Sequence, residues 1–322
     1  YVFRLSQQIK PDNLFTLRVI FLMFDFLGMT FIVLTLRILN LNQNFSLVYF
    51  WSPLIIKETY NSTHLDIIGI SCLCVSIYFL IRKHMMRSIF FLALSVLGKF
   101  YSLVLLPFYL QKSWLIAREK GWHSVAILAY HLTLFCTVIT FFYLPFIDIG
   151  ERAFEGLKTY STDWQSNDSL FAILLFFLKD ILRFGVDIEV PIFGNSMLLA
   201  KSIMALVLLA VITYLLVKKS PSTESPQDLM QNLFLVITII FLISPVQNPW
   251  YLSWSVPFLC FFHSRALILL TGLIGLYYLD FYFDYQGMAQ YSFWIVWLEY
   301  TPFYIYLISE LTKSKNNWTI QK

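Results

Sequence analysis

Charged residues are scarce in this chain. They make up 13% of its 322 residues, about half the share that soluble domains carry. A soluble protein needs charge to cover its surface, so the scarcity excludes an ordinary cytosolic enzyme, a disordered protein and a rod. Hydrophobic residues reach 58% and aromatic residues 19%, and the mean hydropathy is +0.69. These proportions indicate a polytopic helical membrane protein.

The short motifs that bind nucleotides or catalytic zinc are also absent. The sequence contains no G-x-G-x-x-G after a strand, no P-loop and no H-E-x-x-H. A soluble nucleotide-sugar-binding domain is missing as well, so a sugar donor would have to arrive through the membrane. The net charge of +4 fits basic cytoplasmic loops and requires no nucleic acid partner.

Cysteine is rare, and all four cysteines (Cys72, Cys74, Cys136 and Cys260) lie inside apolar runs. No histidine or carboxylate stands near them at the spacing of a metal site. We therefore expect four small core residues rather than disulfides or metal ligands.

Continuous apolar runs follow one another along the whole chain. A helix needs about 20 residues to cross about 30 Å of hydrocarbon, and several runs reach that length while others are too short to cross alone. The runs are Leu14–Leu39, Phe45–Ile56, Leu65–Ile81, Ser88–Leu110, Ser124–Ile147, Leu170–Leu178, Ser196–Val217, Met230–Ser244, Trp250–Phe262, Ala266–Leu279 and Phe293–Leu311. They predict an all-α fold, a polytopic transmembrane helical bundle of roughly nine to eleven membrane segments that include short re-entrant half-helices. We expect a single integral-membrane domain over residues 1–322.

The positive-inside rule assigns the two faces of this bundle. All basic clusters lie inside if Ser88–Leu110 is a hairpin that turns near Lys99 and Leu170–Leu178 is a half-helix on the outer side. The inner clusters are then Arg37, Arg82–Arg87, Lys112–Lys120, Lys218–Lys219, His263–Arg265 and Lys313–Lys322. The outer face carries Lys57–Asp66, an acidic loop over Asp148–Asp168 and Gln247–Pro249. Because the unusual polar residues gather on that face, we expect the protein to work there.

The densest polar patch is Lys57–Asp66, which contains Glu58, Asn61, His64 and Asp66. His64 and Asp66 could hold a phosphate-bearing lipid or a sugar hydroxyl, and a tuned carboxylate can take a proton from an incoming hydroxyl. Two alternatives stay open. Asp66 could only cap the following helix, or Glu58, His64 and Asp66 could bind a divalent cation.

Two charged residues interrupt apolar runs. Lys99 would be costly inside a membrane unless it faces a cavity or a partner, and it is a candidate counter-charge for a lipid phosphate. The alternative is that its stem only reaches to the interface. For Asp25, which lies between Arg18 and Arg37 in the first run, we expect a basic partner on a neighbouring helix rather than a catalytic role.

Aromatic and amide residues form two further candidate groups. Asn248, Trp250 and Tyr251 follow Pro245, and a helix broken by prolines is tolerated only where it faces water or protein. Trp164 and Asn167 occupy a polar loop. These residues could form an interfacial aromatic belt or a rim that stacks on a sugar.

Four short motifs resemble those of one enzyme family, the C-type glycosyltransferases, and especially its bacterial mannosyltransferase-like members. Ser52–Glu58 with His64–Asp66 is similar to an N-P-x-x-I-x-E…H-x-D stretch, although Ser52 stands where the family often has Asn. Lys99 with Leu105–Pro107 is similar to the family's K-x-x-x-x-x-L-P hairpin.

The other two motifs follow in the same order along the chain. Trp164 with Asn167–Ser169 resembles a W-x-x-N-x-S outer loop. Asn248–Tyr251 with Pro257 resembles an N-P-W-Y-x-x-W-x-x-P turn. The likeness covers almost the whole chain, and each motif is short by itself.

The resemblance implies a helical bundle that takes a hexose, mannose or glucose, from a polyprenyl-phosphate donor. The sugar passes to a glycan, lipid or protein acceptor on the outer face, with inversion, while a carboxylate activates the acceptor hydroxyl. It further implies that the principal catalytic Asp, with the first span and first large outer loop, lies upstream of Tyr1. His64 and Asp66 would then support catalysis. The implied donor- or substrate-binding residues are Glu58, Asn61, Lys99, Trp164, Asn167, Asn248, Trp250 and Tyr251.

Two other functions remain alternatives. A transporter or flippase could bind the same lipid-linked sugar without chemistry, since broken helices and an intramembrane lysine also suit transporters. The sequence shows no internal repeat, and its polar features favour one face, which supports the enzyme. A membrane scaffold with aromatic belts is the third interpretation. We expect the bacterial inner membrane as the location, with the endoplasmic reticulum as the eukaryotic equivalent.

Overall fold

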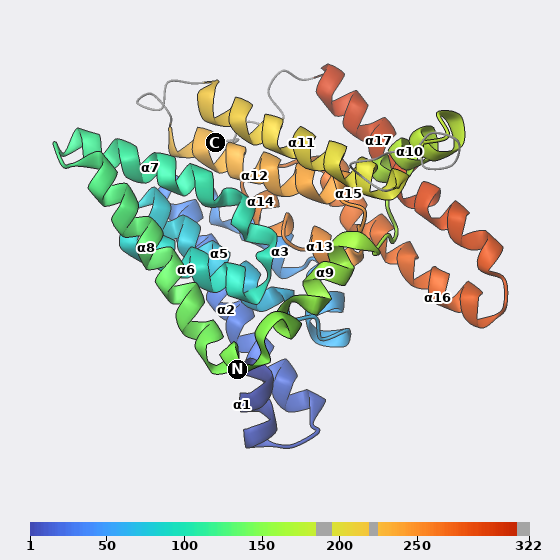
Figure 1. Ribbon diagram of the computed structural model, residues 1–322, viewed down its shortest axis with the longest axis horizontal. Coiled ribbons are helices and arrows are strands. Elements are labelled where there is room, and N and C mark those ends of the chain that lie inside the picture. The colour runs from blue at the N-terminus through green and yellow to red at the C-terminus, as the bar shows by residue number, and fades with distance from the viewer. Residues whose placement is uncertain (185–194, 219–224, 314–322) are drawn as a thin grey trace.

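The computed structural model describes residues 1–184, 195–218 and 225–313, and all the elements in them are helices (Figure 1). The longer ones are α2 (Leu14–Ile38), α5 (Asp66–Ile81), α6 (Met85–Gly98), α7 (Leu106–Glu119), α8 (Ser124–Tyr143), α11 (Ser196–Val217), α12 (Pro226–Ile243) and α17 (Ser292–Lys313). The shorter ones are α1 (Val2–Ile9), α3 (Leu47–Phe50), α4 (Pro53–Ile56), α9 (Glu155–Thr162), α10 (Leu170–Phe176), α13 (Pro249–Leu252), α14 (Val256–Leu259), α15 (Arg265–Leu273) and α16 (Tyr278–Tyr285). The all-α prediction is confirmed for these residues.

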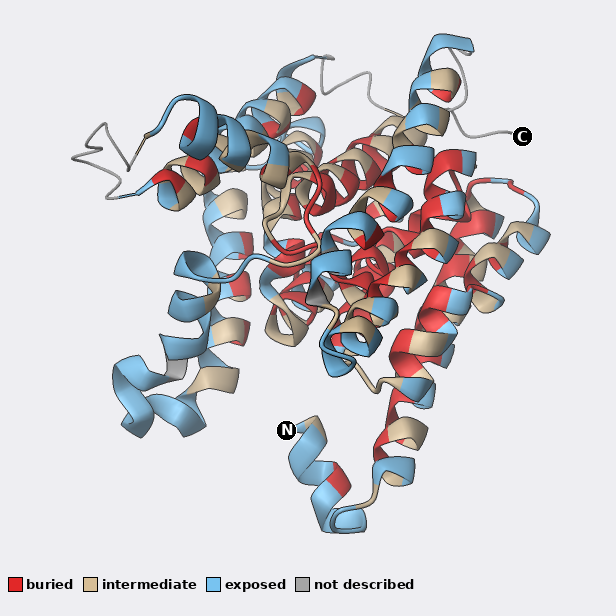
Figure 2. Ribbon diagram, turned by 90° about the vertical axis from the view of Figure 1, so that its right-hand side faces the viewer, coloured by how far each residue is buried: buried red, intermediate tan, exposed pale blue. Residues whose placement is uncertain are grey.

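Five helical segments of the described chain are long and apolar enough to cross a membrane. They are Leu14–Ile38, Ser124–Arg152, Ser196–Val217, Pro226–Ile243 and Arg265–Tyr285. Large apolar side chains such as Phe141, Leu206 and Val217 are exposed on the outer helices, and Figure 2 shows the exposed residues surrounding a buried centre. Apolar surface of this extent is unfavourable in water. The protein is therefore suited to a membrane.

Several helix ends follow from local capping rather than from hydropathy. Ser225 and Asp228 form a reciprocal capping box, and Pro226 occupies the first turn of α12. The helix consequently begins four residues before Met230, where the apolar run was expected to start. Hydropathy misses such an end because the residues that make the cap are polar.

Two of the predicted apolar runs are broken, as their polar and proline residues suggested. The chain reverses at Lys99 between α6 and α7, and Lys83 near the start of α6 pairs with Glu119 at the end of α7 at 3.1 Å. Pro249 and Pro257 each lie in the first turn of a four-residue helix, α13 and α14.

The acidic segment that was expected to be a loop is largely helical. Residues Leu144–Phe154 form tight helical turns that are kinked at Gly150, where φ is 60°, and α9 follows directly. A second difference concerns Cys136, which is exposed, whereas the other three cysteines are buried as expected.

Contacts between distant segments sort the described residues into two ends of the bundle. At the first, which we call the site end, Arg18 donates to the carbonyl of Asn61, and the Asn167 amide donates to the carbonyl of Gln247. The opposite, basic end is marked by the bond from Gln111 to the carbonyl of Leu216 and by those from Ser264 and Arg265 to Glu310.

Two of the lysines that the charge pattern assigned to one face lie at the basic end. Lys112 and Lys218 lie there, next to the joined residues Gln111 and Leu216. Lys219, Lys315 and Lys322 lie outside the described residues.

Helices α5 and α6 approach closely because two glycines face one another. A Cβ on Gly98 would lie 2.9 Å from the Cα of Gly69, and a Cβ on Gly69 would lie 2.5 Å from the ring of Trp254. These distances are too short for real contacts. The glycines thus leave the space in which the Trp254 ring fits beside α5.

We expect Gly69→Ala to lower the free energy of unfolding by about 1–3 kcal/mol, because overpacking forces the helix or the indole to move. Denaturant titration in detergent micelles would measure the change. Gly272→Ala is the matched control, since nothing lies within 4 Å of its added Cβ. Equal stabilities of the two variants would contradict this account of the α5–α6 contact.

Candidate functional site

The centre of the candidate site is an ion pair between two helix ends. Asp66 is the first residue of α5 and Lys99 follows the last residue of α6, so their antiparallel packing brings the two together. The Lys99 ammonium lies 2.7 Å from Asp66 Oδ1, and the Trp254 indole donates to the same oxygen at 2.7 Å. The Asp66 carboxylate is buried. These two side chains hold it, rather than the N–H groups of α5 that the capping alternative required.

A second group of titratable residues lies on the turn before α5. Residues Lys57–Asn61 form a π-helical turn that buries Glu58, and the Tyr278 hydroxyl donates to its two oxygens at 2.8 and 2.9 Å. Thr63 adopts a φ of 59°. The chain then turns back, so that the His64 N–H donates to the Glu58 carbonyl at 2.8 Å and its Nε2 lies 3.4 Å from the Glu58 carboxylate.

Burial shifts both groups toward their neutral forms. It raises the pKa of Glu58 above its ordinary 4.5 and lowers the pKa of His64 below its ordinary 6.5. His64 is therefore neutral at pH 7 and can accept a proton. Its ring is also only partly buried, at 30% exposure, so an incoming group can reach it.

Trp250 and Tyr251 connect these two groups. The rings of His64 and Trp250 stack with centroids 4.0 Å apart and an interplanar angle of 20°. The Lys99 ammonium lies 3.8 Å from the centre of the Tyr251 ring. One side of this aromatic pair thus faces the His64–Glu58 group, and the other faces the lysine.

The two polar loops that the motifs singled out contact one another. Ser166 pairs through its backbone with Pro245 and Gln247, and its hydroxyl donates to the Asn248 side chain at 2.9 Å. Asn167 adopts a φ of 52°, and its amide donates to the carboxylate of Glu299 at 2.8 Å.

Asn248 and Asn167 therefore hold the two loops together through hydrogen bonds. Glu299 was not singled out from the sequence. It is a charged residue inside the last apolar run, just as Lys99 is a charged residue inside an earlier one. That position could have identified Glu299 from the sequence.

Two other predicted residues lie at the margin. Trp164 is half exposed, and its ring lies 5.7 Å from that of Tyr160. Asn61 contributes its backbone carbonyl to the bond with Arg18 at 3.2 Å. Among the described residues, the side chains that bond to Asp66 are those of Lys99 and Trp254, and neither Trp164 nor Asn61 joins them.

An open cavity of about 600 Å³ lies beside Lys99 and Tyr251. Its walls include Tyr101, Tyr160 and Lys201, whose ammonium donates to the carbonyls of α9 and the following loop at 2.9–3.2 Å. Lys201 is the sixth residue of α11 and was missed, although a lysine inside an apolar run was the signal that identified Lys99. The cavity thus contains two cations and aromatic walls.

A second cavity of about 600 Å³ continues this one. The two share Phe100, Tyr143 and Phe154 as lining residues, and the second extends from Ile139 at the end of α8 to Ile147 in the turns that follow it. Its walls are almost wholly apolar, apart from Thr140 and Glu151. Together the two form a groove that leads from two cations to an apolar surface.

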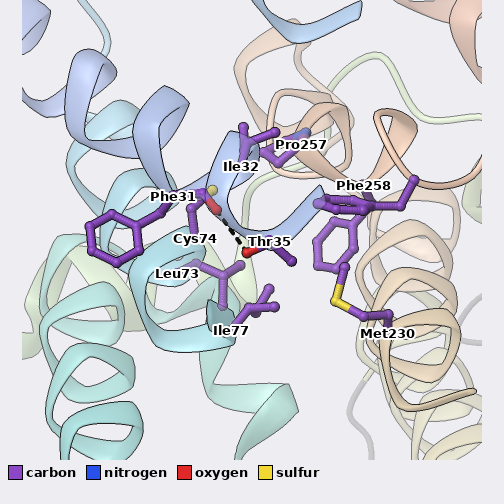
Figure 3. Close-up of a pocket in the computed structure, with 10 residues that line it drawn as sticks. Phe31, Ile32, Thr35, Leu73, Cys74, Ile77, Met230, Pro257 and Phe258 are labelled. Carbon is purple, nitrogen blue, oxygen red and sulfur yellow. Dashed lines mark hydrogen bonds between the residues drawn. The ribbon is translucent and has the colours of Figure 1, made fainter. Parts of the chain in front are cut away.

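Another gap lies in the core between α2, α5, α12 and α14, and holds only about 10 Å³ (Figure 3). Thr35 is its one polar hydroxyl, and it donates to the Phe31 carbonyl at 2.7 Å. The gap has room for about one water molecule. We interpret it as imperfect packing rather than as a ligand site.

The metal alternative is not supported by the geometry. Asp66 is engaged by Lys99 and Trp254, and among the described residues no group of three or more His, Cys, Asp or Glu side chains is placed to hold a metal ion.

The expected basic partner of Asp25 is also absent from its described contacts. Its carboxylate instead accepts hydrogen bonds from the hydroxyls of Tyr49, at 2.7 Å, and Tyr60. Two aromatic hydroxyls can satisfy a buried carboxylate without the charge partner that the sequence suggested.

Comparison of the chain with models of known protein families, with curated proteins and with solved structures finds no match.

Proposed function

We propose that the protein is a multi-pass membrane glycosyltransferase that moves a hexose, mannose or glucose, from a polyprenyl-phosphate donor to an acceptor hydroxyl. The proposal rests on the way a cavity, an apolar groove and a histidine–carboxylate pair are arranged. A cavity with two lysines opens onto an apolar groove, and Tyr251 in its wall connects through Trp250 to a histidine–carboxylate pair.

The groove supports a donor that is both anionic and very apolar. Lys99 and Lys201 would neutralise the phosphate, and Tyr143, Phe154 and Phe100 would contact the isoprenoid chain. Asp66 acts through Lys99, because the ion pair and the Trp254 bond fix where the ammonium lies. Asp66 is therefore a positioning residue in this proposal.

The His64–Glu58 pair beside these aromatic rings supports the acceptor. The acceptor oxygen bonds to the anomeric carbon, and the bond from that carbon to the phosphate oxygen breaks on the opposite face, which inverts the centre. The bond's electron pair leaves with the polyprenyl phosphate. The hydroxyl proton passes to His64, whose imidazolium form Glu58 stabilises at 3.4 Å. Trp250 and Tyr251 offer faces on which the sugar can stack.

We propose that the site end faces outward and the basic end faces the cytoplasm of a bacterium, whose inner membrane is the expected location. Single cysteines at positions 112 and 218, in a Cys136→Ser background, should then react with a membrane-impermeant maleimide only after the membrane is opened. A cysteine at position 158 of exposed α9 should react in intact cells. Labelling of positions 112 and 218 from opposite sides would contradict this orientation.

The function itself is tested with membranes that contain the full-length protein. They would be given labelled polyprenyl-phosphate mannose or glucose, and separately the matching nucleotide sugars. Transfer from the lipid-linked donor alone is the expected result. Movement of the intact donor across the bilayer without transfer would identify a flippase instead. If the membranes show neither transfer nor movement, both the glycosyltransferase and the flippase are excluded.

A further inference from the structure

A cavity of about 380 Å³ lies at the basic end, between the start of α6, the end of α7 and the first turns of α8. Three cations line it, Lys83, Arg87 and Lys120, and no Asp or Glu is among its lining residues. It lies at the other end of the bundle from the candidate site. The inference drawn from it is therefore independent of the proposed function.

The start of α6 adds donors to this cavity. His84 precedes the helix without capping it by a side-chain hydrogen bond, and Met85 and Met86 line the cavity. The first N–H groups of a helix have no partner within the helix, and they carry the positive end of its dipole. A helix start of this kind binds anions, phosphate above all.

Arg87 distinguishes this site from ordinary helix-end electrostatics. Lys83 and Lys120 follow the ends of α5 and α7, where positive charge is favourable. Arg87 lies in the first turn of α6, where a cation opposes the dipole. Helix stability thus accounts for the two lysines, whereas the arginine is unfavourable for its own helix unless an anion joins it.

Two of the three cations, Arg87 and Lys120, are held by aromatic rings rather than by carboxylates. Lys83 has a carboxylate partner, Glu119, but both side chains are more than half exposed. Arg87 lies 5.5 Å from the Phe79 ring centre and Lys120 lies 4.6 Å from that of Trp122. Among the described residues no carboxylate pairs with Arg87 or Lys120. Aromatic faces orient both cations and leave their N–H donors free for an anion.

We propose that this cavity binds a phosphate group, carried either by an anionic phospholipid or by a soluble phosphate. The half-exposed rings of Trp122 and Tyr130 at its rim are of the kind found at membrane interfaces. Basic pockets between helices on the cytoplasmic side suit the headgroups of anionic lipids.

The test counts bound lipid by native mass spectrometry of the full-length protein released from nanodiscs. Wild type should retain phosphatidylglycerol in preference to phosphatidylcholine. Arg87→Gln with Lys120→Gln should weaken that retention about 30-fold, since each basic residue near an anionic surface contributes about a factor of five. Arg4→Gln with Lys10→Gln is the matched control on exposed α1 and should retain the lipid. Met86→Trp, which fills the cavity without changing charge, should also lose it.

Inorganic phosphate distinguishes a soluble phosphate ligand from the headgroup of an anionic phospholipid. If millimolar phosphate stabilises wild type against heat and the Arg87→Gln/Lys120→Gln protein gains nothing, a soluble phosphate is a ligand of the cavity. If only phosphatidylglycerol has these effects, the ligand is the lipid. Equal retention of phosphatidylglycerol and phosphatidylcholine, or equal losses in the control and the test variants, would overturn the proposal.

Discussion

Lys99→Met should reduce transfer from a polyprenyl-phosphate donor by about 10²–10³-fold, the usual effect of losing one group that stabilises developing charge. Lys99 lines the cavity and reaches the Tyr251 face, so the charge on the leaving phosphate would lose its nearest cation. Methionine keeps the length of the side chain and removes the ammonium. The rate should fall and the donor concentration for half-maximal rate should rise, while the acceptor dependence stays the same.

Lys112→Met is the matched control, because it removes a half-buried lysine of α7 at the basic end. Its rate should equal that of wild type. If the donor dependence of Lys99→Met is unchanged, Lys99 does not meet the phosphate, and the ion pair with Asp66 has only a structural role.

The Asp66–Lys99 pair also predicts how a second variant behaves. Asp66→Asn should lower transfer strongly while the protein still inserts into the membrane, because Lys99 loses the carboxylate that holds it at 2.7 Å. If Asp66 acts only through Lys99, the protein that carries both Asp66→Asn and Lys99→Met should be no less active than Lys99→Met alone. An additive loss in this double-mutant cycle would give Asp66 a role separate from Lys99.

The sequence predicted the membrane-suited, all-helical fold and several of the residues that meet. Charge scarcity and long apolar runs depend on composition alone, so they identify this class of fold without any knowledge of packing. Lys99 was recognisable because a charged residue inside an apolar run needs a partner or a cavity, and Asp66 because it belongs to the densest polar patch. Which partner it finds depends on the packing of helices, and no local pattern encodes that packing.

The residues that sequence reasoning missed show this limit. Trp254 was not among the predicted site residues, yet its indole bonds to Asp66 because Gly69 leaves room for the ring. Asp25 was assigned a cationic partner, whereas two tyrosine hydroxyls from the following segment reach it. Both contacts require distant segments to be placed together. Lys201, in contrast, carried the same signal as Lys99 and could have been included.

The division of the site by Trp250 and Tyr251 suggests that its two sides can be disabled separately. Variants on the lysine side should alter donor use, and variants on the His64 side should alter the proton transfer. A flippase that binds the same lipid would depend on the lysines but not on a proton acceptor. The His64 side is therefore the part of the site where the enzyme and the flippase differ most.

His64→Ala should lower the maximal rate by about 10²–10⁴-fold, the range that one general base contributes. The pH profile is the more specific test. Burial lowers the pKa of His64 below 6.5, so neutral imidazole persists through neutrality, and wild-type activity should fall only as the pH drops below that value. In His64→Ala this acid limb should disappear, because no histidine remains to be protonated.

His123→Ala removes an exposed histidine ahead of α8 and should keep both the rate and the acid limb. Added imidazole tests the proton transfer directly, because it can supply a proton acceptor in the space left by the His64 side chain. Rescue of the rate by imidazole would therefore assign the loss to chemistry. An acid limb that survives in His64→Ala would exclude His64 as the base and direct attention to a carboxylate of the site, such as Glu58.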